Sequence, residues 1–324
     1  NRAMRAVLIN DDKSLSLHEV PDPVIKDDEL LIKVMASGVN RADLLQREGN
    51  YPSPAGCPEW MGLEISGTVE KIGPEAAKKS SFKVGDRVCA LMGGGGYADL
   101  AAVRYDMALP LPENFDFAQG ACIPEVYCTA YLNLFHEAAL QPGETLLVFA
   151  GASGVGIAAT QIAKAMGAKV IATVRSDEKA EQIRKFGADV IVNTKKTDIT
   201  KVFEEYPVNV VLDCVAGEQL GTCFTKMARR GRWIMIATLS GTSATIDLRA
   251  LLAGGFCLKG STLRSRTPEF KAQILTEVRE KLYPYFENGA VKPEIYATFP
   301  FEQPEDAQSV LYANKNIGKV ILTH

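Results

Sequence analysis

The sequence predicts an α/β protein that combines a β-rich domain with a doubly wound parallel sheet. Two observations predict it. Up to about residue 122 the chain consists of short apolar runs broken by Gly and Pro, which is typical of β-rich domains. From Thr145 onward, apolar runs alternate with amphipathic stretches of helical spacing. The length of 324 residues fits two domains at about 150 residues each.

The β-rich part begins near the N-terminus. Its apolar runs include Met4 to Asn10, Glu29 to Met35, Gly67 to Ile72 and Arg87 to Leu91. Turn residues recur between such runs about every 8–12 positions, as in an all-β domain. Four consecutive glycines, Gly93 to Gly96, predict a turn or loop, because glycine loses more conformational freedom than any other residue when it is ordered.

The second part repeats strand and helix. The expected strands are residues 145–150, 169–174, 190–193, 208–215 and 232–238, and the expected helices are 155–166, 176–186 and 219–228. Ser176 is a natural N-cap, and Gly167 and Gly187 end the first two helices. Strands joined by helices of this length form βαβ units, and therefore a parallel sheet.

The pattern changes again after Ser265. We expect a long helix at 269–287, a short apolar segment at 296–299 and a final strand at 319–322. We expect this tail to return to the first domain.

Composition excludes several classes of protein. Hydrophobic residues make up 47% and charged residues 23% of the chain, as in ordinary globular proteins. The net charge of -3 and the pI of about 5.8 argue against nucleic acid as a main partner. No apolar run approaches the roughly 18–20 residues that span a bilayer, so we expect no membrane segment.

Cysteine and histidine are few. Seven Cys form no CxxC pair, and only three His are present. These counts argue against a disulfide framework and a four-cysteine zinc lobe, and they favour reduced thiols in a cytoplasmic protein. We interpret Cys122 and Cys128 as buried structural thiols, and His136, on an expected helix at 129–139, as a packed or surface residue.

A glycine-rich loop follows the expected strand at 145–150 and opens the helix after it. Small residues let the backbone approach a pyrophosphate, and the helix N-terminus supplies N–H groups and a positive dipole end. The spacing is GxxGxG rather than GxGxxG, so the context carries the prediction more than the motif, and the alternative is a turn needed only for helix–sheet packing. The candidate cofactor residues of the loop are Ala150, Gly151, Ser153, Gly154, Val155 and Gly156.

The end of the next strand favours NADPH over NADH. An NAD site usually places Asp or Glu there to bind the ribose 2′-hydroxyl. Here the strand ends in Arg175 and Ser176, and Lys179 follows one turn later, which suits a 2′-phosphate. Asp177 opposes this interpretation, and the alternative is that Ser176 is only an N-cap and Lys179 only a solvated residue.

Gly62 to Val69, Val84 to Val88 and the glycine loop form a set of motifs that resembles the medium-chain dehydrogenase/reductase superfamily. The resemblance spans essentially the whole chain. It is strongest to the quinone oxidoreductase branch, which includes zeta-crystallin, and within it to the tumour-suppressor-inducible quinone oxidoreductases. The segments that are similar to this branch are Asn40 to Arg47, Ile123 to Glu125, Leu263 to Arg266 and Ala313 to Lys319.

The resemblance implies a GroES-like domain built from residues 1–122 and 266–324 around a Rossmann domain at 123–265. It also implies NADPH as the hydride donor and a small quinone-like acceptor. Relatives are often homodimers or higher oligomers, and the apolar run Phe256 to Leu263 is a candidate for pairing across a two-fold axis.

The same comparison predicts that no metal is bound. Zinc-dependent relatives carry a cysteine where this chain has Asn40, a histidine where it has Leu63, and a third ligand near Glu125. Catalytic zinc needs about three protein ligands from His, Cys and carboxylates. Asn and Leu cannot replace two of them.

Three residues are candidates for catalysis. The resemblance places Asn40 and Tyr51 where this branch presents a polar pair to the nicotinamide and the acceptor, and an amide and a phenol can both donate to a quinone oxygen as it gains charge. Ser153 of the glycine loop is the third candidate. The alternatives are that Asn40 is a turn residue and Tyr51 a rim aromatic.

Further cofactor contacts are implied by position in the family. The candidates are Val215, Thr238, Leu263 and Asn316, of which the first two follow expected strands at the edge where a ligand crevice forms. The alternative for such positions is simple strand-end packing. Thr194 stands where some relatives place a phosphate-binding tyrosine, so that contact is in doubt.

The sequence is therefore interpreted as an NADPH-dependent, zinc-free reductase that transfers hydride from the nicotinamide to a quinone or another conjugated carbonyl. Two alternatives stay open. The same scaffold supports reductases of 2-alkenals or enoyl thioesters, because fold does not decide substrate. An NADPH-binding protein with a structural or RNA-binding role, as in zeta-crystallin-like relatives, is the alternative of another class, with Arg229 to Arg232 as a local basic patch.

Overall fold

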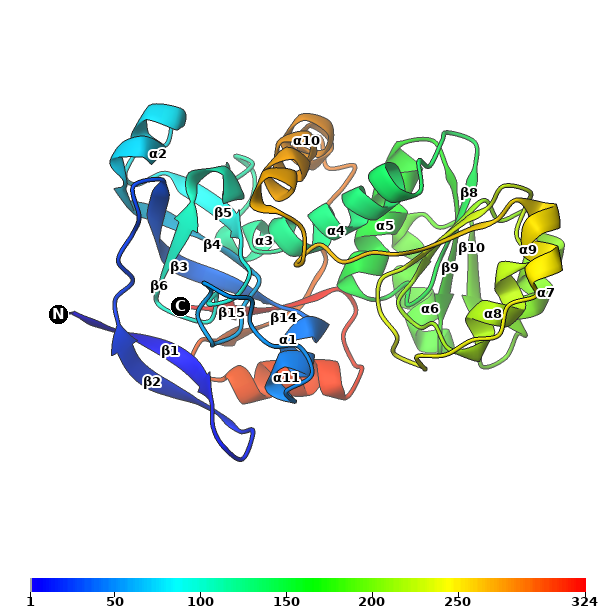
Figure 1. Ribbon diagram of the computed structural model, residues 1–324, viewed down its shortest axis with the longest axis horizontal. Coiled ribbons are helices and arrows are strands. Elements are labelled where there is room, and N and C mark those ends of the chain that lie inside the picture. Colours follow the sequence, from blue (N-terminus) through cyan, green and yellow to red (C-terminus); the bar gives the residue numbers. More distant parts are fainter. Residues whose placement is uncertain (1) are drawn as a thin grey trace. The chain divides into compact units, whose positions relative to one another are not determined.

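The computed structural model describes residues 2–324, which divide into two compact units (Figure 1). Unit 1 comprises the residues up to Cys128 together with Arg266–Glu287 and Pro293–His324, and unit 2 comprises Thr129–Ser265 and Asn288–Lys292. Residues 123–128 and 288–292 therefore belong to the opposite unit from the one that the sequence pattern assigned. For 123–128 the reason is packing, because a π-helix at Ile123–Tyr127 lies against two strands of unit 1, β4 (Glu64–Ile72) and β5 (Arg87–Leu91).

Unit 2 is a six-stranded, wholly parallel sheet, which confirms the predicted Rossmann class. Its order is β10 (Val190–Asn193), β9 (Lys169–Val174), β8 (Thr145–Val148), β11 (Val210–Asp213), β12 (Arg232–Met235) and β13 (Cys257–Gly260). The chain enters at β8, continues outward to β10 and then crosses to β11. The strand order thus reverses beside β8, which is where doubly wound sheets bind ligands.

Five helices of unit 2 follow its strands: α5 (Gly154–Ala165), α6 (Asp177–Ile183), α7 (Ile199–Glu205), α8 (Glu218–Phe224) and α9 (Leu248–Gly254). The sequence predicted α5, α6 and α8 but missed α7 and α9. Helix α9 has no buried residue, so it carries no buried face that a sequence pattern could reveal. The single helix expected at 129–139 is instead α4 (Cys128–Tyr131) followed by a π-helix at Leu132–Glu137. A switch to i→i+5 bonding is not visible in side-chain periodicity.

An aromatic cluster forms the core on one face of this sheet. Trp233 of β12 is fully buried and packs against Phe149, Phe203 and Phe224. Its indole N–H donates to the carboxylate of Asp213 at the end of β11, at 2.9 Å. The other oxygen of this carboxylate accepts the backbone N–H groups of residues 215 and 216, so the core also fixes the turn after β11.

Unit 1 contains a seven-stranded sheet and a separate hairpin. The hairpin is β1 (Ala3–Ile9) and β2 (Leu15–Pro21), and the sheet runs β14 (Ile295–Pro300), β15 (Lys319–Thr323), β3 (Glu29–Val39), β4 (Glu64–Ile72), β5 (Arg87–Leu91) and β7 (Ala108–Pro110), with β6 (Leu100–Arg104) paired to β3. The last strand of the chain, β15, pairs antiparallel with β3. Residues from both ends of the sequence are thereby brought together in one sheet.

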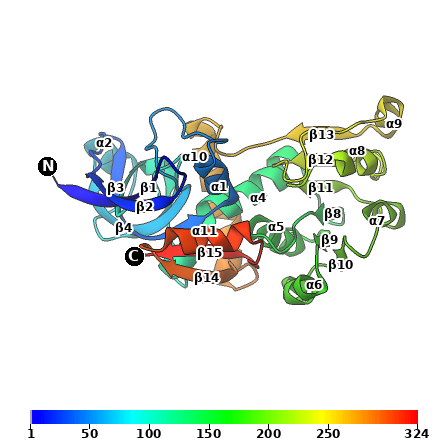
Figure 2. The same cartoon turned by 90° about the horizontal axis from the view of Figure 1, so that it is seen from below.

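Five helices lie on or beside this sheet: α1 (Arg41–Arg47), α2 (Pro74–Lys79), α3 (Phe117–Gly120), α10 (Pro268–Glu287) and α11 (Pro304–Tyr312). Helix α11 packs on β14 and β15 (Figure 2). No helix among residues 2–324 has both the length and the apolar character to cross a membrane.

A close approach of two backbone segments explains why glycine stands at positions 62 and 96. Gly62 has φ +118°, and a Cβ there would collide with the backbone of Gly96. The four glycines from Gly93 lie in the loop between β5 and β6, as predicted, and the close approach of the two backbones accounts for glycine on both sides. Leu63, the residue after Gly62, directly precedes β4.

The cysteines are all free thiols. Cys122 and Cys128 are fully buried, which confirms the structural interpretation, and burial raises the pKa of both thiols well above the usual value. Such thiols are poor nucleophiles.

Candidate functional site

The glycine loop joins β8 to α5 in unit 2. Ala150 has φ +52°, and the N–H of Gly151 donates to the carbonyl of Thr173 on the neighbouring strand at 2.7 Å. A Cβ at Gly156 would collide with the carbonyl oxygen of Ala150, and one at Gly151 would lie 2.9 Å from the Cβ of Ala172. These two glycines therefore permit a tight loop that brings backbone N–H groups to the helix N-terminus, as pyrophosphate binding requires.

Ser153 is the N-cap of α5. Its hydroxyl accepts the N–H of Gly156 at 3.1 Å and donates to the carbonyl of Ala150 at 2.7 Å. The hydroxyl proton is thus committed within the loop. Ser153 can offer a ligand its remaining lone pair, or help indirectly by holding the loop in shape.

The next strand ends in a charged corner. Arg175 is exposed directly after β9, and Ser176 is the N-cap of α6, with its hydroxyl oxygen accepting the N–H of Lys179 at 3.1 Å. The hydroxyl hydrogen of Ser176 can therefore still be donated to a ligand. Thr194 lies beside this point, because its N–H donates to the carbonyl of Val174 at 2.9 Å.

The opposing charge, Asp177, has its own partners. The amide of Asn193 donates to one carboxylate oxygen at 3.0 Å, and Lys196 forms an ion pair with the other. These contacts hold the pKa of Asp177 below its usual value, with Lys196 the larger cause. The charge of Asp177 at this corner is therefore partly offset by Lys196.

The remaining unit 2 candidates follow the same edge of the sheet. Val215 comes after β11, where its N–H donates to Asp213 at 2.7 Å, Thr238 comes after β12, and the buried Leu263 comes after β13. Because all six strands are parallel, their carboxyl ends meet at one edge. The structure therefore aligns the glycine loop, the charged corner and these three residues along that edge.

Asn40 lies in unit 1 and is the N-cap of α1, directly after β3. Its backbone N–H donates to the carboxylate of Asp43 at 2.9 Å. The same carboxylate oxygen accepts the hydroxyl of the buried Tyr97 at 2.7 Å. Desolvation raises the pKa of the fully buried Asp43 to about 6.

The side chain of Asn40 belongs to a buried polar cluster that the sequence did not reveal. Its amide nitrogen donates to Glu64 on β4 at 3.0 Å, and its amide oxygen accepts the ammonium of Lys319 on β15 at 2.9 Å. Lys319 and Glu64 form an ion pair of 2.8 Å, in which the two side chains are only 6% and 0% exposed. Both residues stand inside motifs that carried the family resemblance, but nothing in their spacing showed that they meet.

Glu125 borders the same cluster. Its backbone N–H donates to the second oxygen of Glu64 at 2.9 Å. Desolvation, and then the charge of Glu64, raise the pKa of Glu125 to about 8, while Lys319 and Lys271 act in the opposite direction. At neutral pH this carboxyl group is therefore mostly protonated.

Two further candidates lie in unit 1. Tyr51 is half-buried in a bend two residues after Gly49, which has φ +85°. Asn316 donates from its amide nitrogen to the carbonyl of Gly318 at 2.9 Å, and its buried amide oxygen has no hydrogen-bond partner among residues 2–324. A buried acceptor without a donor is expensive in free energy, so it suits a ligand that supplies one.

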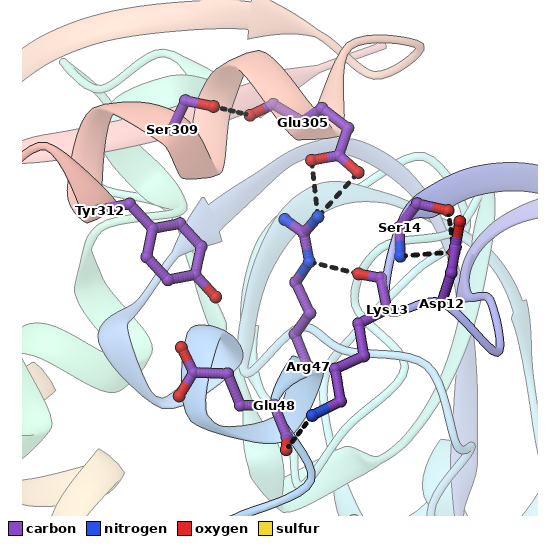
Figure 3. Close-up of a pocket in the computed structure, with 8 residues that line it drawn as sticks. All are labelled: Asp12, Lys13, Ser14, Arg47, Glu48, Glu305, Ser309 and Tyr312. Carbon is purple, nitrogen blue, oxygen red and sulfur yellow. Dashed lines mark hydrogen bonds and ion pairs between the residues drawn. The ribbon is translucent and has the colours of Figure 1, made fainter.

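A surface hollow of about 430 Å³ on unit 1 contains none of the candidate residues (Figure 3). Its centre is the bidentate ion pair of Arg47 on α1 with Glu305 on α11, at 2.8 and 2.7 Å. The same guanidinium donates to the carbonyl of Lys13 in the β1–β2 turn at 2.7 Å. Arg47 thereby ties α1, α11 and the β1–β2 turn together, which indicates a structural role.

Two family models match separate parts of the chain. The family description "Alcohol dehydrogenase GroES-like domain" matches residues 26–113, and "Zinc-binding dehydrogenase" matches residues 154–279. These two matches fall in unit 1 and mainly in unit 2 respectively.

The chain is similar along its whole length to quinone oxidoreductases. It is 34% identical to that of Sus scrofa over 310 residues, which cover 94% of this chain and 92% of the relative, and 32% identical to that of Homo sapiens over 330 residues, which cover 99% and 97%. The crystal structure of Escherichia coli quinone oxidoreductase complexed with NADPH aligns with a TM-score of 0.86 and 27% identity, over 99% of each chain. The chain belongs to the medium-chain dehydrogenase/reductase family and is an oxidoreductase of its quinone oxidoreductase branch.

Proposed function

We propose that this enzyme is an NADPH:quinone reductase that works without zinc. The observation that carries the proposal is the fixed amide of Asn40, held between Lys319 and Glu64 at the position where zinc-dependent relatives carry a cysteine. A hydrogen-bond donor in place of a metal ligand suits an acceptor oxygen that gains charge without a Lewis acid.

The donor set at this position does not suit zinc. Asn40 is an amide, Leu63 is a buried hydrocarbon, and the Lys319 ammonium already lies 2.8 Å from Glu64. Zinc would need about three anionic or imidazole ligands with an open position. We therefore expect full activity after treatment with a chelator.

NADPH fits the residues of unit 2. The glycine loop would hold its pyrophosphate, and Arg175, Ser176 and Lys179 would hold the 2′-phosphate, with the charge of Asp177 offset by Lys196. Further contacts are proposed for Val215, Thr238, Leu263 and Asn316. Among these, the buried amide oxygen of Asn316 is ready to accept an N–H group of the cofactor.

The chemistry supplied by bound NADPH is transfer of one hydride from the nicotinamide to the acceptor. The acceptor then carries negative charge on oxygen, which Asn40 and Tyr51 would stabilise by donating hydrogen bonds. A proton from solvent completes the hydroquinone, so that NADPH, quinone and one proton give NADP⁺ and hydroquinone. Ser153 would keep the loop beside the cofactor in shape.

Steady-state rates under NADPH with ortho-quinones, para-quinones, 2-alkenals and enoyl thioesters test this proposal. We expect quinones to give the highest kcat/KM. A higher value for alkenals or thioesters would assign the enzyme to that class instead. Tight, salt-sensitive RNA binding without turnover of any acceptor would support the non-enzymatic alternative.

Tyr51→Phe tests the role of the phenol. We expect kcat to fall about 3–10-fold, because one donor to the developing oxyanion is lost, while the dissociation constant of NADPH stays unchanged. Unchanged turnover would show that Tyr51 is a rim aromatic. Tyr296→Phe, at an exposed phenol on β14, is the matched control.

We propose further that two copies of the chain pair through the edge of the unit 2 sheet. β13 is an edge strand of this sheet (Figure 2). Leu258 on β13 is 40% exposed, and Leu248 and Leu252 of α9 are 72% and 84% exposed. An exposed apolar edge strand is normally covered. Leu258→Lys should convert a dimer to a monomer in light scattering, and a monomeric wild-type enzyme would refute the pairing.

The seven free thiols support a place in the reducing cytoplasm. Cell fractionation with an antibody to the enzyme would test this, and recovery in an oxidising compartment would contradict it.

A further inference from the structure

The buried ammonium of Lys319 has three acceptors, all in unit 1. They are the carboxylate of Glu64 at 2.8 Å, the amide oxygen of Asn40 at 2.9 Å and the carbonyl of Val39 at 3.0 Å. An ammonium has three N–H donors and no acceptor, so its capacity is filled. The side chain therefore has a single well-defined position between β15, β3 and β4.

This ammonium decides which way the amide of Asn40 faces. The amide oxygen must lie toward Lys319, because a lysine can only donate, and the amide nitrogen must lie toward Glu64, to which it donates at 3.0 Å. A flipped amide would place N–H groups against an ammonium and an oxygen against a carboxylate. Two charge-assisted hydrogen bonds therefore lock one orientation.

Glu64 is held as firmly as the amide. Its second oxygen accepts the backbone N–H of Glu125 at 2.9 Å, and Asn40 itself is fixed at its backbone by Asp43 at 2.9 Å. The amide nitrogen of Asn40 carries two hydrogens, of which Glu64 takes one. The second N–H is consequently presented in a constant direction.

We propose that Lys319, acting with Glu64, is a positioning residue that presents the free N–H of Asn40 to the acceptor oxygen. This inference rests on the proposed function, in which Asn40 contacts the acceptor. A preorganised donor stabilises charge better than one that must reorient during the reaction. The Lys319–Glu64 pair thus orients the N–H group of Asn40 and does not itself contact the acceptor.

Stability alone does not explain the pair. Replacing a buried ion pair by neutral side chains of similar volume is often neutral or stabilising, whereas removing one partner leaves a buried charge. The double variant Glu64→Gln/Lys319→Met should therefore fold, while the amide of Asn40 loses the ammonium that orients it. Lys319→Arg keeps a cation at this position and is the conservative variant.

The test compares the double variant in two backgrounds. In the wild-type background we expect the double variant to lower kcat/KM for a para-benzoquinone about 10–50-fold, while the dissociation constant of NADPH stays unchanged. The single variant Lys319→Arg, which keeps a cation beside Asn40, should lose less of this kcat/KM than the double variant does. In an Asn40→Ala background the same double change should lower the rate less than about 2-fold, since the pair then has no amide to position. Equal losses in both backgrounds, or no loss in either, would overturn the inference.

A readout without turnover separates this inference from the proposed function. In ¹⁵N-labelled apoenzyme, the side-chain amide signal of Asn40, identified by its disappearance in Asn40→Asp, should exchange slowly with water and should exchange faster in the double variant. Slow exchange together with no quinone turnover in the wild-type enzyme would refute the proposed function and leave the positioning intact. Quinone turnover with equal exchange in both proteins would refute the positioning alone.

Discussion

The candidate sites of the two units consist of different kinds of groups. In unit 2 the site consists of backbone groups, glycines, helix N-caps and two cationic side chains at the ends of adjacent parallel strands, all set by local sequence. In unit 1 it consists of buried charged and polar side chains on β4, on β15 and at the N-cap of α1, from both ends of the chain. Cofactor binding in unit 2 should therefore be weakened by side-chain atoms added to the glycine loop. The stability of the polar cluster in unit 1 should instead depend on the charges of its side chains and on pH.

The largest effect is expected for the single variant Lys319→Met. It leaves the fully buried carboxylate of Glu64 without its cation, so we expect the free energy of unfolding to fall by about 3–5 kcal/mol. Urea denaturation at pH 7 measures this loss. Adding Glu64→Gln should recover most of it, and a single variant as stable as the wild type would show that the cluster is not governed by charge.

Glu125→Gln tests the pH dependence that the cluster predicts. The folded-state pKa of Glu125 is about 8, above the unfolded value, so the native state keeps a proton that the unfolded chain releases. Stability from this group is present below about pH 4.5 and is lost as pH rises through about 8. We expect Glu125→Gln to reduce the loss between pH 5 and 9, by up to about 3 kcal/mol, in urea denaturation series.

The contrary outcome would be an identical slope of stability against pH in Glu125→Gln and the wild-type enzyme. Glu113→Gln is the control, since it changes an exposed carboxylate of the same unit.

Gly156→Ala tests the backbone site of unit 2. The added Cβ would collide with the carbonyl of Ala150, so we expect NADPH affinity to fall at least about 30-fold and stability to fall by about 2 kcal/mol. Fluorescence titration with NADPH and urea denaturation measure the two effects. Gly260→Ala is the matched control, because a Cβ there meets open space. Equal NADPH affinities in the two variants would show that the glycine loop does not bind the cofactor.

The smallest effect is expected at the charged corner. Lys179→Glu should raise the KM for NADPH about 10-fold and leave that for NADH nearly unchanged, because only NADPH carries the 2′-phosphate. Lys196→Ala should give a smaller change in the same direction, since it uncovers the charge of Asp177. Equal changes in KM for NADPH and NADH would show that the residues of this corner do not bind the 2′-phosphate.

Sequence reasoning was most successful where structure follows from neighbouring residues. β9 and β10 have the expected bounds, Ser176 caps α6 as predicted, and Gly187 ends the adjoining 3₁₀ turn with φ +92°. It was less accurate for β11 and β12, which end at Asp213 and Met235, earlier than expected. After β11, the carboxylate of Asp213 accepts the N–H groups of residues 215 and 216, and these hydrogen bonds form the turn that follows the strand.

The sequence by itself determined the fold class and the Rossmann sheet, because periodicity, glycine spacing and capping residues act over short stretches of chain. The family followed from the resemblance of its motifs. It also singled out Asn40 as a candidate. Only the tertiary structure decided what holds Asn40, because the pairing of β15 with β3 brings Lys319 to Glu64 and Asn40. A buried ion pair depends on which strands become neighbours, and that follows from the closure of the whole sheet rather than from any local pattern.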